Sequence, residues 1–410
     1  MIRSKILPAI LLISLSLSLV LLYQGNTFTA ERPMEPEPII EKVPTRVDTL
    51  VMQYDTLITH LLDSANIVGA AVVITHHGEV IYQKCHGVRE VGSPESVNPY
   101  TVFRLASVSK PVTGILAGIL AHDSIIGLDD KVIDYIPDFT LKDTFSTREL
   151  TVRNILSHSS GLVPHAYDNL VEAKVPFSVI LDSLRHVNIA GPPGMYYGYQ
   201  NVVFSLYDTI AAIKTGKRFE NLMQEKVFDP LGMKHASAGL EAFAQNKNKA
   251  MPHRRTGTGY RTLPLNDRYY NTNPAAGINA SISDMGRFLS ALTTNDPSLL
   301  DPAIPDTVLS PQIISPLRWI YLRRWNGVES KYYGLGWRII GYKGRQIAYH
   351  GGYLSGYRAE IAVCREEGLG IAFLSNAPGR VGSEVVPALL DMWLTPNQTA
   401  PLIADKHLSD

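Results

Sequence analysis

A serine and a lysine, Ser107 and Lys110, stand three residues apart in the stretch FRLASVSKP at residues 103–111. If a helix begins here, positions i and i+3 share one face, so the two side chains can meet. Pro111 favours such a start, because proline is tolerated in the first turn of a helix and disfavoured later. A neutral lysine amine can take the proton of a serine that attacks a carbonyl, and burial keeps lysine neutral. The same spacing also describes a serine N-cap beside a surface lysine, and the pair alone does not decide between these interpretations.

Two other stretches carry groups that could serve such a serine. PGMYYGYQN at residues 193–201 holds Tyr199, whose hydroxyl can relay a proton, and Asn201, whose amide can orient a substrate carbonyl. YHGG at residues 349–352 places the titratable His350 beside two glycines, which let a substrate backbone approach a strand edge closely. Each of these short strings is common when it occurs alone.

In this order, the three elements resemble the motif set of the serine β-lactamase-like and penicillin-binding family. The resemblance is greatest to its branch of class C β-lactamases, D-alanyl-D-alanine carboxypeptidases and esterases, and it covers residues 50 to 395. The elements are Ser107-x-x-Lys110, Tyr199-x-Asn201 and His350-Gly351-Gly352. Accessory stretches are similar too, namely GLDDKVIDYIP at 127–137, LTVRNILSHSSGL at 150–162, FDPLGM at 228–233, NPAAGINASISDM at 273–285 and YGLGW at 333–337.

The resemblance implies a role for each matching residue. Ser107 is the expected acyl-accepting nucleophile, Lys110 its base and Tyr199 the proton relay. Asn201 is expected to contact the amide of the substrate. The resemblance further implies an oxyanion hole formed by the backbone N–H groups of Ser107 and Tyr353, and such donors typically stabilise a transition state by about 3 kcal/mol.

Two positions depart from the family pattern. Many β-lactamases have Lys-Thr-Gly where this chain has the substrate-binding candidates His350, Gly351 and Gly352, and a histidine is only partly charged near neutral pH. Gln200 stands where a smaller residue is usual, and we expect its bulkier amide near the pocket. Both departures favour an esterase or peptidase over an efficient β-lactamase.

The hydrophobic pattern predicts the elements that position these residues. A helix is expected from Leu50, a β-hairpin over 69–87 around His77-Gly78, and three short strands over 345–376 before a C-terminal helix. The region from about 136 to 330 is predicted to be mainly helical, with a capping box at Ser281. We therefore predict an α+β fold: an antiparallel sheet built from N- and C-terminal strands with flanking helices, plus a mainly helical inserted subdomain.

Composition sets the broader limits. The chain has 410 residues with 38 Lys+Arg and 38 Asp+Glu, so its formal net charge is +0 and no basic excess points to nucleic acid. Neither a nucleotide-binding glycine motif nor a spacing typical of metal ligands occurs, so neither a cofactor nor a metal is expected.

The N-terminal residues differ from the rest. Arg3 and Lys5 precede an apolar run over residues 6–23, which is typical of an export signal. We expect residues 1–30 to be a signal peptide or a membrane anchor, with the choice left open. Residues 31–49 form a Pro-rich spacer, 50–395 the folded domain and 396–410 a tail. The expected location is periplasmic or extracellular, with residues 6–23 as the membrane tether if they are retained.

The predicted function is an exported serine hydrolase that forms an acyl-enzyme on Ser107 and cleaves ester or small amide or peptide bonds. Its expected partner is a small-molecule ester, amide or peptide substrate, and the oligomeric state is left open. Alternatives with the same chemistry are a D-alanyl-D-alanine carboxypeptidase, a D-aminopeptidase or a weak β-lactamase. An alternative of a different class is a penicillin-binding sensor or a non-catalytic scaffold.

Overall fold

The computed structural model describes residues 45–316 and 322–395. The expected signal or anchor, all but the last residues of the expected spacer, and the expected tail lie outside these residues. Among the helices described, none is both long and apolar enough to cross a membrane.

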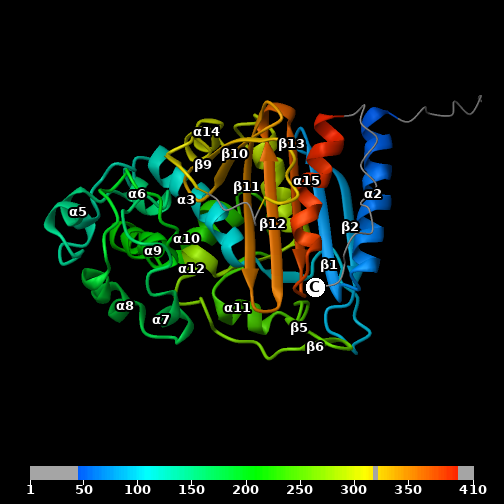
Figure 1. Cartoon of the computed structure of the whole chain (residues 1–410), viewed down its shortest axis with the longest axis horizontal. Coiled ribbons are helices and arrows are strands. Elements are labelled where there is room, and N and C mark those ends of the chain that lie inside the picture. Colours follow the sequence, from blue (N-terminus) through cyan, green and yellow to red (C-terminus); the bar gives the residue numbers. More distant parts are fainter. Residues whose placement is uncertain (1–44, 317–321, 396–410) are drawn as a thin grey trace, which may run out of the picture. The chain divides into compact units, whose positions relative to one another are not determined.

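The main sheet has eight antiparallel strands in the order β2-β1-β13-β12-β11-β10-β9-β8 (Figure 1). It joins the two ends of the folded chain, because β1 pairs with β13 from Ala70 opposite Ser375 to His76 opposite Leu369. The strands are β1 Gly69–His76, β2 Glu79–Gly87, β8 Ile313–Ile314, β9 Val328–Tyr333, β10 Arg338–Tyr342, β11 Arg345–Leu354, β12 Tyr357–Cys364 and β13 Leu369–Ser375. The predicted antiparallel sheet of N- and C-terminal strands is confirmed.

Helices cover both faces of this sheet (Figure 1). On β1, Ala70, Val72 and Ile74 pack with helices α2 (Arg46–Ser64) and α15 (Val381–Leu394). The alternate residues Ala71 and Val73 belong to the core on the opposite face, with α3 (Ser109–His122) and α13 (Ile282–Thr293). This alternation follows from the two-residue period of a strand, so both faces of β1 are apolar.

Local signals in the sequence account for several element boundaries. The hairpin turn uses His77 and Gly78, both with positive φ, as the twist of a two-residue hairpin requires. Helix α13 begins with the expected capping box, in which the Ser281 side chain accepts from the Asp284 N–H. Helix α2 starts at Arg46, within the stretch that we expected to be spacer.

The inserted region is mainly helical, as predicted. Its helices are α4 Val132–Tyr135, α5 Thr144–Glu149, α6 Val152–Leu156, α7 Asp168–Glu172, α8 Phe177–Ser183, α9 Asn201–Thr215, α10 Phe219–Met223, α11 Leu240–Gln245, α12 Asn273–Ala276 and α14 Ala303–Val308. Two small sheets accompany them, one of β3 (Val102–Arg104), β7 (Ile278–Ser281) and β4 (Ser237–Ala238), the other of β5 (His253–Thr256) and β6 (Gly259–Thr262).

Candidate active site

Ser107 lies in a single 3-10 turn, η1 (Ala106–Val108), between strand β3 and helix α3. The helix therefore begins two residues later than Ser107, and its N-cap, Val108, makes no side-chain capping bond. Ala106 has φ 48°, in the left-handed region that alanine rarely adopts. Because Ser107 caps nothing and Lys110 is fully buried, the N-cap interpretation with a surface lysine is excluded.

The neighbouring serine has a different environment. Ser109 is fully buried, and its hydroxyl accepts a hydrogen bond of 3.0 Å from the backbone N–H of Ile278 in strand β7. This bond ties the start of α3 to the small sheet, so Ser109 has a structural role and Ser107 is the serine beside the lysine.

Lys110 is held by two acceptors. Its Nζ lies 2.7 Å from Asn201 Oδ1 and 3.0 Å from the Ala275 carbonyl oxygen. Burial holds the pKa of Lys110 well below its usual range; the nearby Asp168 opposes this shift and Arg338 adds to it. A neutral amine has two N–H donors and one lone pair, and both donors are used here. The lone pair is left to accept a proton.

Tyr199 connects the serine to this lysine. Its hydroxyl hydrogen-bonds with the side chain of Ser107, and its ring centroid lies 4.6 Å from Lys110 Nζ. Burial raises the pKa of Tyr199, so the phenol is protonated at neutral pH. A protonated phenol cannot serve as the base itself, but it can pass on a proton.

Asn201 is the first residue of α9, and both ends of its amide are engaged within the protein. Its Oδ1 accepts from Lys110, and its Nδ2 donates to Asp168 Oδ1 and Oδ2 at 3.1 and 3.0 Å. Asn201 therefore contacts the lysine in this structure, and its contact with the substrate amide, which the family resemblance implies, stays a prediction.

His350 is fully buried on β11, and its ring is held from both sides. Arg338 Nη1 lies 3.2 Å from Nδ1, and the Tyr333 hydroxyl lies 3.1 Å from Nε2. Nδ1 also lies 2.9 Å from the Gly351 carbonyl oxygen, which can only accept, so the two neighbours of Nδ1 favour opposite positions of the ring proton. Burial, and then the Arg338 charge, hold the pKa of His350 well below its usual range, so the ring is neutral at neutral pH.

The two glycines after His350 face opposite sides of the sheet. A Cβ on Gly352 would lie 2.4 Å from the Leu105 carbonyl oxygen and 3.2 Å from the Ser107 nitrogen, so this glycine lets β11 touch η1. A Cβ on Gly351 would instead meet Glu360 and the Tyr349 hydroxyl. Gly352 thus borders the serine directly, and Gly351 does not.

The strand register places the backbone of Tyr353 at an open edge. The β11–β12 hairpin has a two-residue loop, so Leu354 and Tyr357 form a hydrogen-bonded pair and Tyr353 and Arg358 do not. The N–H of Tyr353 therefore points away from β12. Strand β10 pairs with β11 only up to Tyr349, which leaves that side of Tyr353 without a strand neighbour among the described residues. This geometry is compatible with the expected oxyanion donor.

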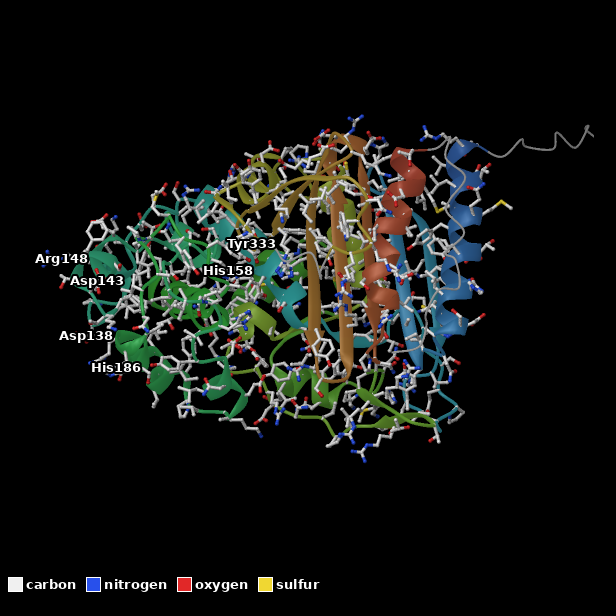
Figure 2. The ribbon with its side chains drawn as sticks, viewed as in Figure 1. Asp138, Asp143, Arg148, His158, His186 and Tyr333 are labelled. Carbon is white, nitrogen blue, oxygen red and sulfur yellow. The ribbon has the colours of Figure 1, made fainter. Side chains whose placement is uncertain are left out.

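His158 packs against an aromatic cluster next to the site. It is buried, and its ring centroid lies 4.2 Å from that of Tyr199 and 4.7 Å from that of Tyr333. Figure 2 shows His158 and Tyr333 close together, where the helical region meets the sheet. Its Nδ1 accepts from the Gln200 N–H at 3.2 Å. Gln200 itself is fully buried, and its side-chain amide donates to the Val163 carbonyl oxygen.

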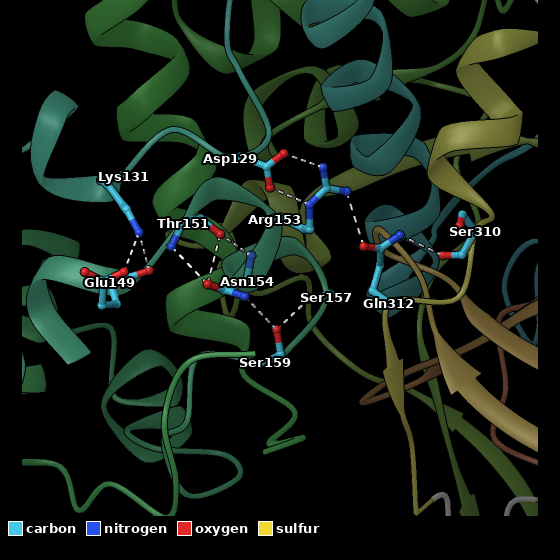
Figure 3. A network of polar contacts seen from close by, with 10 residues as sticks. All are labelled: Asp129, Lys131, Glu149, Thr151, Arg153, Asn154, Ser157, Ser159, Ser310 and Gln312. Carbon is cyan, nitrogen blue, oxygen red and sulfur yellow. Dashed lines mark hydrogen bonds and ion pairs between the residues drawn. The ribbon is translucent and has the colours of Figure 1, made fainter. Parts of the chain in front are cut away.

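A polar network fixes the segment that carries His158 (Figure 3). Thr151 and Asn154 form the capping box of α6, and Asn154 Nδ2 donates to the Ser159 hydroxyl at 3.1 Å. Arg153 donates to the Asp129 carboxylate and to Gln312 Oε1, so it joins two loops that are far apart in the sequence. The network holds residues 157–159 beneath Tyr199.

Three residues of this site were not predicted from the sequence: Asp168, Tyr333 and Arg338. Tyr333 begins the YGLGW stretch, and Arg338 follows directly after it. The family resemblance therefore pointed to this segment but gave no reason to expect the positive charge of Arg338 in the site. Asp168 has no local pattern that could have identified it, because its contact with Asn201 arises from the packing of α7 against α9.

The comparisons with known proteins agree with this geometry. The beta-lactamase family model matches residues 54–391, so the chain belongs to the beta-lactamase family, whose members are generally serine hydrolases. The predicted family is therefore confirmed.

Individual relatives are distant. The chain is 26% identical to the unguisins hydrolase ungD' of Aspergillus campestris, over 87% of this chain and 68% of the relative. It is 23% identical to Protein flp of Staphylococcus aureus, over 83% of this chain and 64% of the relative. The chain thus spans about two thirds of the length of these relatives. The octameric penicillin-binding protein homologue from Pyrococcus abyssi has the same fold, with TM-score 0.73 and 22% identity over 84% of this chain and 77% of that chain.

Proposed function

We propose that the protein is a serine hydrolase that cleaves ester or small amide or peptide bonds through an acyl-enzyme on Ser107. The observation that carries this proposal is the set of three groups at one point. The Ser107 hydroxyl hydrogen-bonds with a protonated tyrosine, beside a buried lysine that has both of its neutral-state donors engaged.

In the first step, Ser107 Oγ attacks the carbonyl carbon of the substrate. The serine proton passes to the lone pair of Lys110, with Tyr199 as the relay, and the carbonyl oxygen becomes an oxyanion. The N–H groups of Ser107 and Tyr353 stabilise that oxyanion. When the bond to the leaving group breaks, the alcohol or amine takes the proton back from the lysine and tyrosine pair. The ester on Ser107 remains.

In the second step, water attacks this ester. The same pair accepts a proton from the water and then returns one to Ser107 Oγ as the acid product leaves. Both steps need a proton acceptor that is neutral at working pH, and burial shifts Lys110 in this direction by lowering its pKa.

The neutral His350 supports a preference for esters or small amides over β-lactams, because it brings no permanent charge of its own to the third motif. The name of one relative, a hydrolase, agrees with a catalytic role, and the intact Ser107, Lys110 and Tyr199 set argues against a non-catalytic scaffold.

Covalent labelling tests the proposal. We expect a fluorophosphonate to add to Ser107, detected by intact mass and peptide mapping. Ser107→Ala should abolish labelling, whereas the matched variant Ser109→Ala should keep it, since the Ser109 hydroxyl is buried and already accepts from the Ile278 N–H. No labelling of the folded wild-type protein would contradict the proposal.

Turnover assays then rank the substrates. We expect a short p-nitrophenyl ester to be hydrolysed faster than nitrocefin, with a D-Ala-D-Ala peptide as the third substrate. Labelling by a penicillin with no turnover of any substrate would favour a sensor instead. Fastest hydrolysis of nitrocefin would show that the preference against β-lactams is wrong.

We also propose that the protein is exported, on the basis of the charged and apolar N-terminal sequence. Cell fractionation with an antibody against the folded domain tests this proposal. Detection of the protein in the cytoplasmic fraction alone would contradict it.

A further inference from the structure

Asp168 links the candidate base to the protein surface through two contacts. It is the first residue of α7, and its side chain is 18% exposed. On the inner side both carboxylate oxygens accept from Asn201 Nδ2, and on the outer side Oδ2 lies 2.8 Å from Nδ1 of His165.

The inner contact fixes the orientation of the Asn201 amide. A carboxylate can only accept, so the amide must turn its Nδ2 toward Asp168. Its Oδ1 is then directed at Lys110, where it meets Nζ at 2.7 Å. If the amide were flipped, its NH₂ would face the lysine and remove one of the two acceptors that hold Lys110.

The two charges nearest to Lys110 act in opposite directions. Asp168 raises the pKa of Lys110, and Arg338 lowers it. The described residues show no ion pair between Arg338 and a carboxylate; burial lowers the pKa of Arg338, and the surrounding tyrosines raise it. The Arg338 charge also acts on the buried Glu360, whose pKa it lowers against the effect of burial.

Other polar and titratable groups also lie close to Lys110 and Asp168. Around Lys110 they are Ser107, Tyr199, His158, His350, Asn201 and the Ala275 carbonyl. Around Asp168 they are His165, Tyr199 and Tyr269.

We propose that Asp168 is a positioning residue for the acyl transfer at Ser107, which acts by locking the Asn201 amide toward Lys110. The inference rests on the proposed function, because it concerns the base of that reaction. Asp168 touches neither the reacting serine nor the lysine directly, so it acts through Asn201.

Two variants at position 168 separate the effect of the negative charge from the effect of the hydrogen bonds that orient the Asn201 amide. Asp168→Asn removes the charge but keeps a side-chain oxygen that can accept from Asn201. Asp168→Ala removes both. Arg338→Gln removes the opposing charge, and Asp182→Asn, in an exposed ion pair on α8, is the matched control.

The experiment measures kcat and kcat/KM for a neutral p-nitrophenyl ester across pH, together with the rate of fluorophosphonate labelling of Ser107. A base works only when deprotonated, so activity is lost as pH falls through the pKa of Lys110. Removing the Asp168 charge should lower that pKa and move the acid limb to lower pH. Removing the Arg338 charge should raise it and move the limb to higher pH.

The value of kcat at pH values above the acid limb, the plateau, tests whether the Asp168–Asn201 contact orients the amide. Asp168→Asn should keep kcat at the plateau within about threefold, whereas Asp168→Ala should lower kcat about tenfold with little change in KM, as for loss of a charge-assisted hydrogen bond. Asp182→Asn should match wild type throughout.

Several outcomes would overturn the inference. One is an acid limb in Asp168→Asn that stays in place or moves to higher pH. Others are limbs that move in the same direction in the Asp168 and Arg338 variants, or equal plateaus in Asp168→Asn and Asp168→Ala. If wild type is labelled at Ser107 but the limbs do not move, only the positioning role fails. If wild type is not labelled, the proposed function itself fails.

Discussion

At Gly352, the backbone of β11 and the turn that carries Ser107 are in direct contact. The position allows no Cβ, because a methyl group would lie 2.4 Å from the Leu105 carbonyl oxygen. The contact sets the distance between the N–H of Ser107 and the strand that holds Tyr353. Because Gly352 has no side chain, the backbone N–H groups of Ser107 and Tyr353 can come close enough to donate to the same oxygen.

Gly352→Ala should therefore impair the reaction more than the fold. We expect kcat/KM for a p-nitrophenyl ester to fall about 100-fold, because a displacement of about 1 Å at reacting groups has a cost of this size. Gly257→Ala is the matched control, since its Cβ would meet nothing within 4 Å. Activity within twofold of wild type in Gly352→Ala would contradict the proposed geometry.

At the scale of elements, the sequence was most informative where the signal is local. The hairpin around His77-Gly78 and the capping box at Ser281 follow from neighbouring residues, and the structure has both. The exact start of α3 could not be predicted, because the 3-10 turn at Ser107 packs against β11, which is far away in the sequence.

The candidate site shows the same division. Ser107, Lys110 and Tyr199 could be named only together, from an ordered set of motifs that resembles a known family, because the spacing of Ser107 and Lys110 alone left two interpretations open. Asp168 and Arg338 could not be named, because their effect on Lys110 comes from elements that meet only in the folded chain. A charge that acts across space leaves no periodic pattern in a sequence.

The capping box of α6 gives a prediction at this scale. Thr151→Ala removes the side-chain acceptor for the Asn154 N–H, and we expect the free energy of unfolding to fall by about 1 kcal/mol. Urea denaturation measures it, with Thr140→Ala, an exposed loop threonine, as the control. An equal change in both variants would show that the cap contributes nothing specific.

At the scale of the whole molecule, buried neutral histidines make stability depend on pH. The pKa values of His158 and His350 are held well below the usual value, chiefly by burial. As pH falls below about 6.5, the unfolded chain binds protons at these positions and the folded chain does not, so the free energy of unfolding decreases. Burial also raises the pKa of Asp208 to about 6, which acts in the opposite direction at lower pH.

Comparison of variants isolates the histidine contribution. His158→Gln should lose less stability than wild type between pH 7.5 and pH 5.5 in urea denaturation, even if it is less stable at both. His60→Gln, an exposed histidine on α2, should lose as much as wild type. A His158→Gln protein with the same loss as wild type would contradict this account.

The pairing of β1 with β13 has a consequence for how the protein is made. Translation runs from the N-terminus, so β1, which ends at His76, leaves the ribosome long before β13, which begins at Leu369. During that interval β1 has apolar residues on both faces and one open edge, a surface that readily pairs with other chains. A product truncated before β11 would carry the serine and the lysine without the strand that completes their site.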